Sequence, residues 1–363
     1  MSESARVSSP ASAPPVPRFG RYSVLMPISS GRETGIWWAR LHQGAAGFEK
    51  DFVVKAVHPE RVDDPDVVSA FLDEARLAAR MCHPQVVQVF ELGAEVGIPY
   101  IAMERISGPT LAALQRRIGR LEARPYGAIA WTMAQLCRGL AHIHELCDED
   151  DQPLGLVHGD LRLDNIIVSP VGGPKIVDFG VAAALQRGIG PLAGQGPAAD
   201  LFQVGVLLHW LCTGQPPYPD DSLRSLYEGT VQGEMVDPIT LSADLPPALA
   251  SILSRALSRD PSRRQAAAHL LAEELDAFCA SLEVRPTADS VGALVLSLMP
   301  PPVAPASGGM ALEDLERTFT IRTALLVNQR SAAAASGLAP HPAAAFLASV
   351  ILVFGLAYAA GYL

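Results

Sequence analysis

The chain has 363 residues, of which 49% are apolar and 18% charged, and this length suffices for one two-lobed domain of about 250 residues with tails. The 28 basic and 38 acidic residues give a net charge of −10, which argues against nucleic acid as a partner. The cysteines at positions 82, 137, 147, 212 and 279 follow neither a disulfide nor a metal-ligand spacing, so we expect reduced packing residues in a cytosolic domain.

Residues 1–18 are rich in Ser, Ala and Pro, which predicts a disordered leader without a signal-peptide core. Residues 21–40 then alternate apolar and polar side chains around a turn, as a β-hairpin does. The run 52–57 is rich in β-branched residues and contains one basic side chain, Lys55. A lysine in a buried strand needs a partner, because an unpaired buried charge is costly.

The next elements alternate between helix and strand. Residues 64–81 carry apolar side chains at helical spacing, with Glu74 on the same helix. Two further strands are expected at 86–90 and 100–104, and helix-forming residues dominate 110–146.

Two short polar motifs then follow each other closely. The stretch 157–168 (VHGDLRLDNIIV) places Asp160 and Asn165 five positions apart, ahead of a β-branched run. Thirteen residues after Asn165 comes Asp178, the first residue of D-F-G. Two longer patterns complete the series, DLFQVGVLLHWLCTGQPPY at 200–218 and DPSRR at 260–264.

In this order, the motifs resemble those of bacterial serine/threonine protein kinases of eukaryotic type over about residues 19–283. The stretch 158–165 is similar to the kinase catalytic loop H-R-D-L-x-x-x-N, residues 200–218 resemble helix F, and residues 260–264 resemble the D-P-x-x-R turn. The resemblance implies an α+β, two-lobed protein kinase-like fold. Its small β-rich N-lobe would be residues 19–106 and its larger helical C-lobe residues 107–283.

The resemblance also implies a serine/threonine protein kinase that uses ATP and Mg²⁺. Asp160 would take the proton of the acceptor hydroxyl, and Arg162 stands where the family has a phosphate-contacting Lys. Asn165 and Asp178 would hold the metal. The resemblance also implies which residues contact the nucleotide. They occupy the family's positions in the glycine-rich hairpin, the Lys strand, its helical Glu partner, the gatekeeper and the hinge: Ile28, Gly31, Ile36, Val53, Lys55, Glu74, Met103, Glu104 and Ile106.

Several features depart from the family pattern. Of the family's aligned loop glycines only Gly31 is present. Residues 181–199 contain no Ser, Thr or Tyr and lack the A-P-E motif, whose Glu pairs with the Arg aligned with Arg264. We therefore expect Arg264 to face solvent or to find another partner. Gly159 replaces the Arg that would contact an activation-loop phosphate, so both ends of that phosphate switch are missing together.

Three functions stay open on this basis. The complete set of ATP, metal and acceptor groups favours an active protein kinase. The short segment after D-F-G and the altered glycine-rich loop favour a pseudokinase scaffold that binds nucleotide with little transfer. The H-G-D-L sequence also resembles aminoglycoside and fructosamine phosphotransferases, which act on small hydroxyl compounds.

The tail carries a different signal. Residues 284–342 are interpreted as a linker and juxtamembrane segment. Residues 343–363 form an uncharged run long enough to cross a hydrocarbon layer of about 30 Å at about 1.5 Å per residue. Arginines precede this run and no charge follows it. The sequence therefore predicts a C-terminal transmembrane helix in the cell membrane, single-pass, with the kinase-like domain cytoplasmic.

Overall fold

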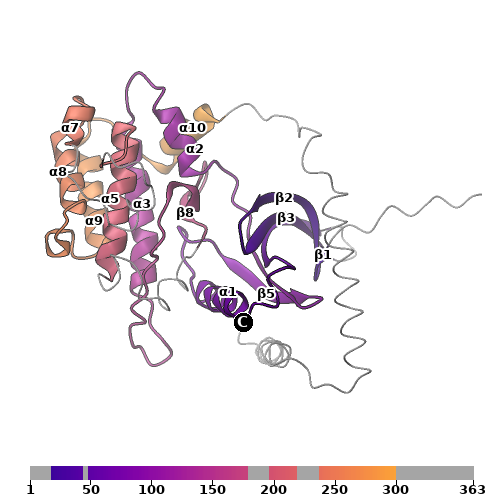
Figure 1. Ribbon diagram of the computed structural model, residues 1–363. Helices are drawn as coiled ribbons and strands as arrows, with labels where there is room; N and C mark the ends of the chain where they lie inside the picture. The colour runs from indigo at the N-terminus through magenta and orange to yellow at the C-terminus, as the bar shows by residue number, and fades with distance from the viewer. Residues whose placement is uncertain (1–17, 44–47, 179–195, 219–236, 300–363) are drawn as a thin grey trace, which may run out of the picture. The chain divides into compact units, whose positions relative to one another are not determined.

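The computed structural model describes residues 18–43, 48–178, 196–218 and 237–299 (Figure 1). These residues divide into two compact units. The first unit comprises residues 18–63 and 93–102, and the second comprises residues 64–92 and 103–299.

The strands form an antiparallel array at the start of the chain. β1 (Arg18–Phe19), β2 (Tyr22–Ser30), β3 (Thr34–Gln43) and β4 (Phe48–Val57) pair in sequence order. The sheet continues through β6 (Ile98–Glu104) to β5 (Val89–Glu95), which gives the order β1-β2-β3-β4-β6-β5. The predicted hairpin at 21–40 is confirmed as β2 and β3.

Strand alternation gives this sheet two different faces. One face carries the aromatic core of the first unit, in which Tyr22 packs edge-on against Phe52 with ring centroids 5.1 Å apart. In the register of β3 and β4, Ile36 lies opposite Lys55 and Trp38 lies opposite Val53. Because paired residues share a face, these four side chains lie on the face away from the aromatic core.

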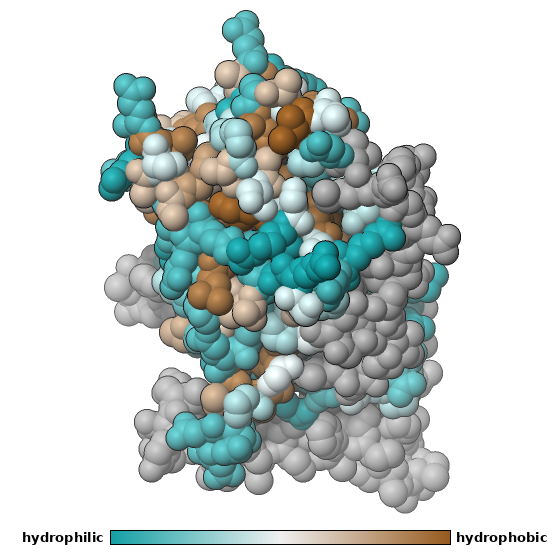
Figure 2. Space-filling model, turned by 90° about the vertical axis from the view of Figure 1, so that its left-hand side faces the viewer, coloured by the Kyte–Doolittle hydropathy of each residue, from teal (hydrophilic) through white to brown (hydrophobic). Residues whose placement is uncertain are grey.

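Helices dominate the second unit. α1 (Pro65–Ala79) begins at the Asp64 cap, α2 (Leu111–Ile118) at the Thr110 cap, and α3 (Tyr126–His144) runs beside α5 (Pro197–Thr213) and α9 (Ala268–Ser281). The smaller helices are α7 (Pro238–Leu241), α8 (Pro247–Ala256) and the 3₁₀ turn Pro261–Arg263. The described surface on the side of α7, α8 and α9 mixes hydrophilic and hydrophobic residues (Figure 2).

The structure refines one predicted segment and differs from another. The helix-forming stretch 110–146 contains two helices, because residues 119–125 separate α2 from α3. Helix propensity alone did not reveal this break. The expected strand 86–90 does not join the sheet until Val89, because Val86 and Val87 pair with Ile176 instead: Val87 N donates to Ile176 O at 2.8 Å.

A short hairpin lies between the two polar motifs. β7 (Ile166–Ser169) begins directly after Asn165, and β8 (Gly173–Ile176) ends two residues before Asp178. Ile166 pairs with Ile176, and Val177 N donates to Asn165 O at 3.0 Å. The hairpin reverses the direction of the chain, so Asn165, just before β7, and Asp178, just after β8, lie at the same end of the hairpin.

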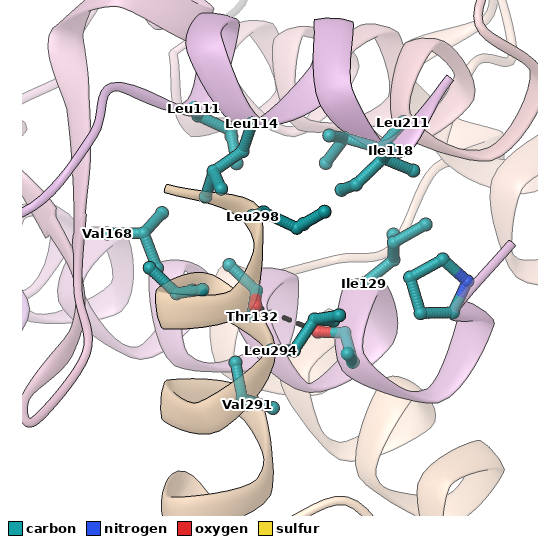
Figure 3. Close-up of a pocket in the computed structure, with 13 residues that line it drawn as sticks. Leu111, Leu114, Ile118, Ile129, Thr132, Val168, Leu211, Val291, Leu294 and Leu298 are labelled. Atoms are coloured by element: carbon teal, nitrogen blue, oxygen red, sulfur yellow. Dashed lines mark hydrogen bonds between the residues drawn. The ribbon is translucent and has the colours of Figure 1, made fainter. Parts of the chain in front are cut away.

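The predicted linker at 284–342 begins with a packed helix, α10 (Ala288–Leu298), which starts with a capping box between Thr287 and Ser290. α10 lies against α2, α3 and the β7–β8 hairpin. Its apolar side chains and those of α2 and α3 point toward one another around a small apolar pocket (Figure 3). Gly292 sits against the carbonyl of Pro170, where a Cβ would lie 2.0 Å from the oxygen.

This close approach leads to a prediction. We expect Gly292→Ala to lower the free energy of unfolding by about 1–3 kcal/mol, because the added methyl group overpacks the contact with Pro170. Gly172→Ala is the matched control, since the nearest atoms to a Cβ there, on Ser169, are 3.9 Å away. Urea unfolding of both variants checks the difference. Equal stabilities would show that α10 is not held at this contact.

Among the described helices, none is both long and apolar enough to span a membrane. The predicted span at 343–363 lies outside the described residues, as do residues 1–17 of the leader, residues 179–195 and the tail from residue 300. The membrane helix therefore stays a prediction.

Candidate active site

The two polar motifs form one cluster in the second unit. Asn165 closes a 3₁₀ turn, Leu163–Asn165, and its Nδ2 donates to Asp160 O at 3.0 Å and to Asp160 Oδ2 at 3.3 Å. The β7–β8 hairpin returns the chain to Asp178, whose charge acts on Asp160. Arg162 is exposed beside them. The structure thus brings together the predicted acceptor base and both predicted metal ligands.

The protonation of Asp160 is shifted by its surroundings. Burial raises the pKa of the Asp160 carboxyl above its ordinary value, and the negative charge of Asp178 acts in the same direction. The positive charge of Arg162 opposes this rise in pKa, and the neighbouring His158 and the hydrogen bond from Asn165 also oppose it. A carboxylate with a raised pKa is a better proton acceptor, as general base catalysis requires.

Asp200 anchors the loop that carries Asp160. Its carboxylate is fully buried in α5 and accepts hydrogen bonds from His158 N at 2.7 Å, Gly159 N at 2.8 Å and, at 2.8 Å, from His144 Nε2. Gly159 has a φ of 75°, a left-handed conformation that glycine adopts without a steric penalty. This role of Asp200 was not predicted from the sequence. A carboxylate within a mostly apolar helix was the available signal, since such a charge needs partners.

Arg264 is buried and has other hydrogen-bond partners, so the expectation of another partner is confirmed and the expectation of a solvent-facing side chain is wrong. The side chain is 6% exposed and donates from Nε to Ser258 O at 2.7 Å and from Nη1 to Ala198 O at 2.6 Å. Its guanidinium also lies 4.9 Å from the ring centroid of Phe202. These contacts tie the 260–264 turn to the start of α5, the helix that carries Asp200.

The predicted hinge begins at the C-terminal end of β6, which includes Met103 and Glu104. Met103 is buried, and Ile106 is half-buried. Glu104 N donates to Gln88 O at 2.9 Å, while its carboxylate accepts from Lys175 Nζ at 2.8 Å. Only the backbone of Glu104 was expected to take part in the hinge. The ion pair adds a link from the hinge to β8, the strand that leads to Asp178.

Part of the predicted nucleotide set lies in the first unit. Ile36, Val53 and Lys55 share the sheet face away from the aromatic core, and Lys55 is only 8% exposed. Ile28 on β2 is 54% exposed. Gly31 lies in the β2–β3 turn, where its N donates to Thr34 O and its carbonyl lies 3.1 Å from His58 Nε2.

Glu74 lies on α1 in the second unit, half-buried. Since Lys55 belongs to the first unit, the pairing of Lys55 with Glu74 stays a prediction.

The residues fit a magnesium site. No group of three His, Cys, Asp or Glu side chains placed to hold a metal occurs in the part of the chain that the structure describes. Magnesium needs fewer protein ligands, because it is usually bound by one or two carboxylates together with substrate phosphates and waters. Asp178 provides a carboxylate. Asn165 turns its amide nitrogen to Asp160, which leaves Oδ1 as the ligand atom.

Comparison with known proteins identifies the family of this domain. The family model "Protein kinase domain" matches residues 44–194. The chain is 33% identical over 279 residues to the tyrosine-protein kinase MasK of Myxococcus xanthus, and 26% identical over 263 residues to the serine/threonine-protein kinase PrkC of Bacillus subtilis. The chain carries a bacterial protein kinase domain of the eukaryotic type.

The matched share of this chain is larger than the matched share of either relative. The matches extend over 72% and 68% of this chain but only 43% of MasK and 38% of PrkC, so the chain spans less than half of either relative. The kinase domain of Mycobacterium tuberculosis PknI matches with a TM-score of 0.53 at 22% identity, over 72% of this chain and 97% of that domain. This likeness confirms the expected kinase fold with a β-rich part and a helical part.

Proposed function

We propose that the chain is a serine/threonine protein kinase that transfers the γ-phosphate of Mg-ATP to hydroxyl groups of proteins. The observation that carries this proposal is the cluster of Asp160, Asn165 and Asp178, with the Asn165 amide bonded to the Asp160 carboxylate. The family match and the named serine/threonine kinases among the relatives support it.

Each side chain has a role in this reaction. Asp160 accepts or orients the proton of the acceptor hydroxyl, and Arg162 places a positive charge beside the transferring phosphate. Asn165 and Asp178 hold Mg²⁺, which neutralises phosphate charge when bound. Positioning and charge stabilisation supply most of phosphoryl transfer, so these groups suffice for the chemistry.

The acceptor residue is the open part of the proposal. Tyrosine is the second candidate, because MasK is named a tyrosine-protein kinase and Arg162 offers a planar guanidinium where the family pattern has Lys. Incubation of the full-length chain with labelled Mg-ATP and a general protein substrate, followed by phosphoamino acid analysis, separates the two. Label in phosphoserine and phosphothreonine supports the proposal. Label confined to phosphotyrosine replaces the acceptor, and label only in small hydroxyl compounds replaces the substrate class.

The raised pKa of Asp160 predicts a pH dependence. A general base acts in its charged form, so kcat/KM should fall as the pH falls through the raised pKa of Asp160. Arg162→Gln removes a charge that lowers this pKa, and the acid limb should therefore move to higher pH. The exposed Arg120 provides the control variant, Arg120→Gln. A limb that stays in place in Arg162→Gln would remove Asp160 from the role of base.

We also propose that residues 343–363 anchor the protein in the cell membrane, with the kinase domain on the cytoplasmic side. The uncharged run of this segment supports the proposal. A chain without residues 343–363 is expected in the soluble fraction, whereas a chain without residues 1–17 is expected to stay with membranes. Membrane recovery of both truncated chains would contradict the anchor.

A further inference from the structure

A second buried polar side chain on α5 also contacts the catalytic loop. Gln203 is 1% exposed and lies one helical turn after Asp200. Its Oε1 accepts a hydrogen bond from Leu161 N at 2.9 Å, and its Nε2 donates to Gly159 O at 3.1 Å. Gly159 and Leu161 are the residues on either side of Asp160.

We propose that Gln203 is a positioning residue that sets the orientation of Asp160 for phosphate transfer. The proposal rests on the proposed function. One carboxamide holds the backbone both before and after Asp160, so rotation of either adjoining peptide plane would break a hydrogen bond in a buried place, where an unmade bond is costly.

Gln203 and Asp200 divide the loop backbone between them. Asp200 takes the N–H groups of His158 and Gly159, whereas Gln203 takes the carbonyl of Gly159 and the N–H of Leu161. Asp160 O accepts from Asn165. The backbone on both sides of Asp160 is thus held by side chains that each bind different backbone groups. Because Asp200 and Gln203 share no hydrogen bond, neither can replace the other.

The chemistry of the contact requires an amide. A glutamine offers an acceptor and a donor on one planar group, whereas a glutamate has no donor for the Gly159 carbonyl and a leucine has neither. Gly159 contributes no side chain of its own and has a φ of 75°, so the loop depends on its neighbours for its conformation.

Substitution of Gln203 is expected to lower kcat. A displacement of about 1 Å at a reacting group can cost on the order of a hundredfold in rate. Gln203→Leu and Gln203→Glu are therefore expected to lower kcat by roughly ten- to a hundredfold, with the KM for ATP changed by less than about threefold. The nucleotide contacts predicted at Lys55 and the hinge do not involve Gln203, which is why binding is spared.

Gln265 is the matched control. It is also a buried glutamine, 1% exposed, but it binds Ile252 O and the Glu274 carboxylate, away from the loop. Kinetics and urea unfolding of the full-length wild type, both Gln203 variants and Gln265→Leu form the experiment. At a comparable loss of stability, kcat should fall much further in the Gln203 variants than in Gln265→Leu. Similar kcat values in wild type and Gln203→Leu, or an equal fall in Gln265→Leu, would overturn it.

Amide hydrogen exchange at Leu161 tests the positioning role of Gln203 separately from the proposed kinase function. The Leu161 amide should exchange about tenfold faster in Gln203→Leu than in wild type, because its acceptor is gone. A wild type without transfer to any acceptor overturns the proposed function. Unchanged exchange at Leu161 overturns the positioning role of Gln203 whatever the activity.

Discussion

Replacement of Asp200 by alanine is expected to lower the free energy of unfolding by about 3–5 kcal/mol, the largest stability loss that we predict for a single side chain. The carboxylate is fully buried and accepts hydrogen bonds from two loop N–H groups and from His144. Its removal leaves the buried His158 N–H and His144 Nε2 without this acceptor, and each such group costs about 1–3 kcal/mol. Urea unfolding of the full-length chain measures the loss.

Asp164→Ala is the control for this prediction, because Asp164 belongs to the same loop but is exposed. Substitutions at such surface positions usually stay within about 0.5 kcal/mol. A loss below about 1 kcal/mol for Asp200→Ala would mean that the loop is held in another way.

Replacement of Asp178 by asparagine is expected to abolish most of the stabilisation that Mg-ATP gives. A ligand at ten times its dissociation constant raises the free energy of unfolding by about 1.4 kcal/mol. The substitution removes the carboxylate ligand of the metal, so the affinity for Mg-ATP should fall by at least about tenfold. Thermal or urea unfolding with and without Mg-ATP checks this result.

Asp289→Asn serves as the comparison, since Asp289 is an exposed acidic residue at the start of α10. This variant should keep the full response to Mg-ATP. If Asp178→Asn responds as strongly as Asp289→Asn, Asp178 does not hold the metal.

Much of the site could be predicted because its signals are local in the sequence. Asp160 and Asn165 are five residues apart, and a tight hairpin joins Asn165 to Asp178, so their spacing already defines their proximity. The β-branched run around Lys55 likewise predicted a strand, found as part of β4. Local pattern and local structure agree at these positions.

The contacts that hold the site could not be predicted in this way. Asp200 reaches loop residues about forty positions earlier, and Lys175 reaches Glu104 across seventy-one positions. The sequence lacks the A-P-E glutamate that pairs with this arginine in the family, and Arg264 instead donates to the backbone carbonyls of Ser258 and Ala198. Which carbonyls it reaches depends on how the chain packs. Neither residue type nor spacing encodes these pairs, because they form only when α3, α5 and the hairpin pack together.

The most direct test of the central claim compares phosphate transfer by wild type and Asp160→Asn. With labelled Mg-ATP, the wild type should incorporate label into protein hydroxyl groups, and Asp160→Asn should lower the rate by about 10²–10⁴-fold while keeping its stabilisation by Mg-ATP. The exposed neighbour variant Asp164→Asn should transfer at the wild-type rate. Equal rates in wild type and Asp160→Asn, or no transfer by either, would contradict the kinase account, and the second result would favour a nucleotide-binding pseudokinase.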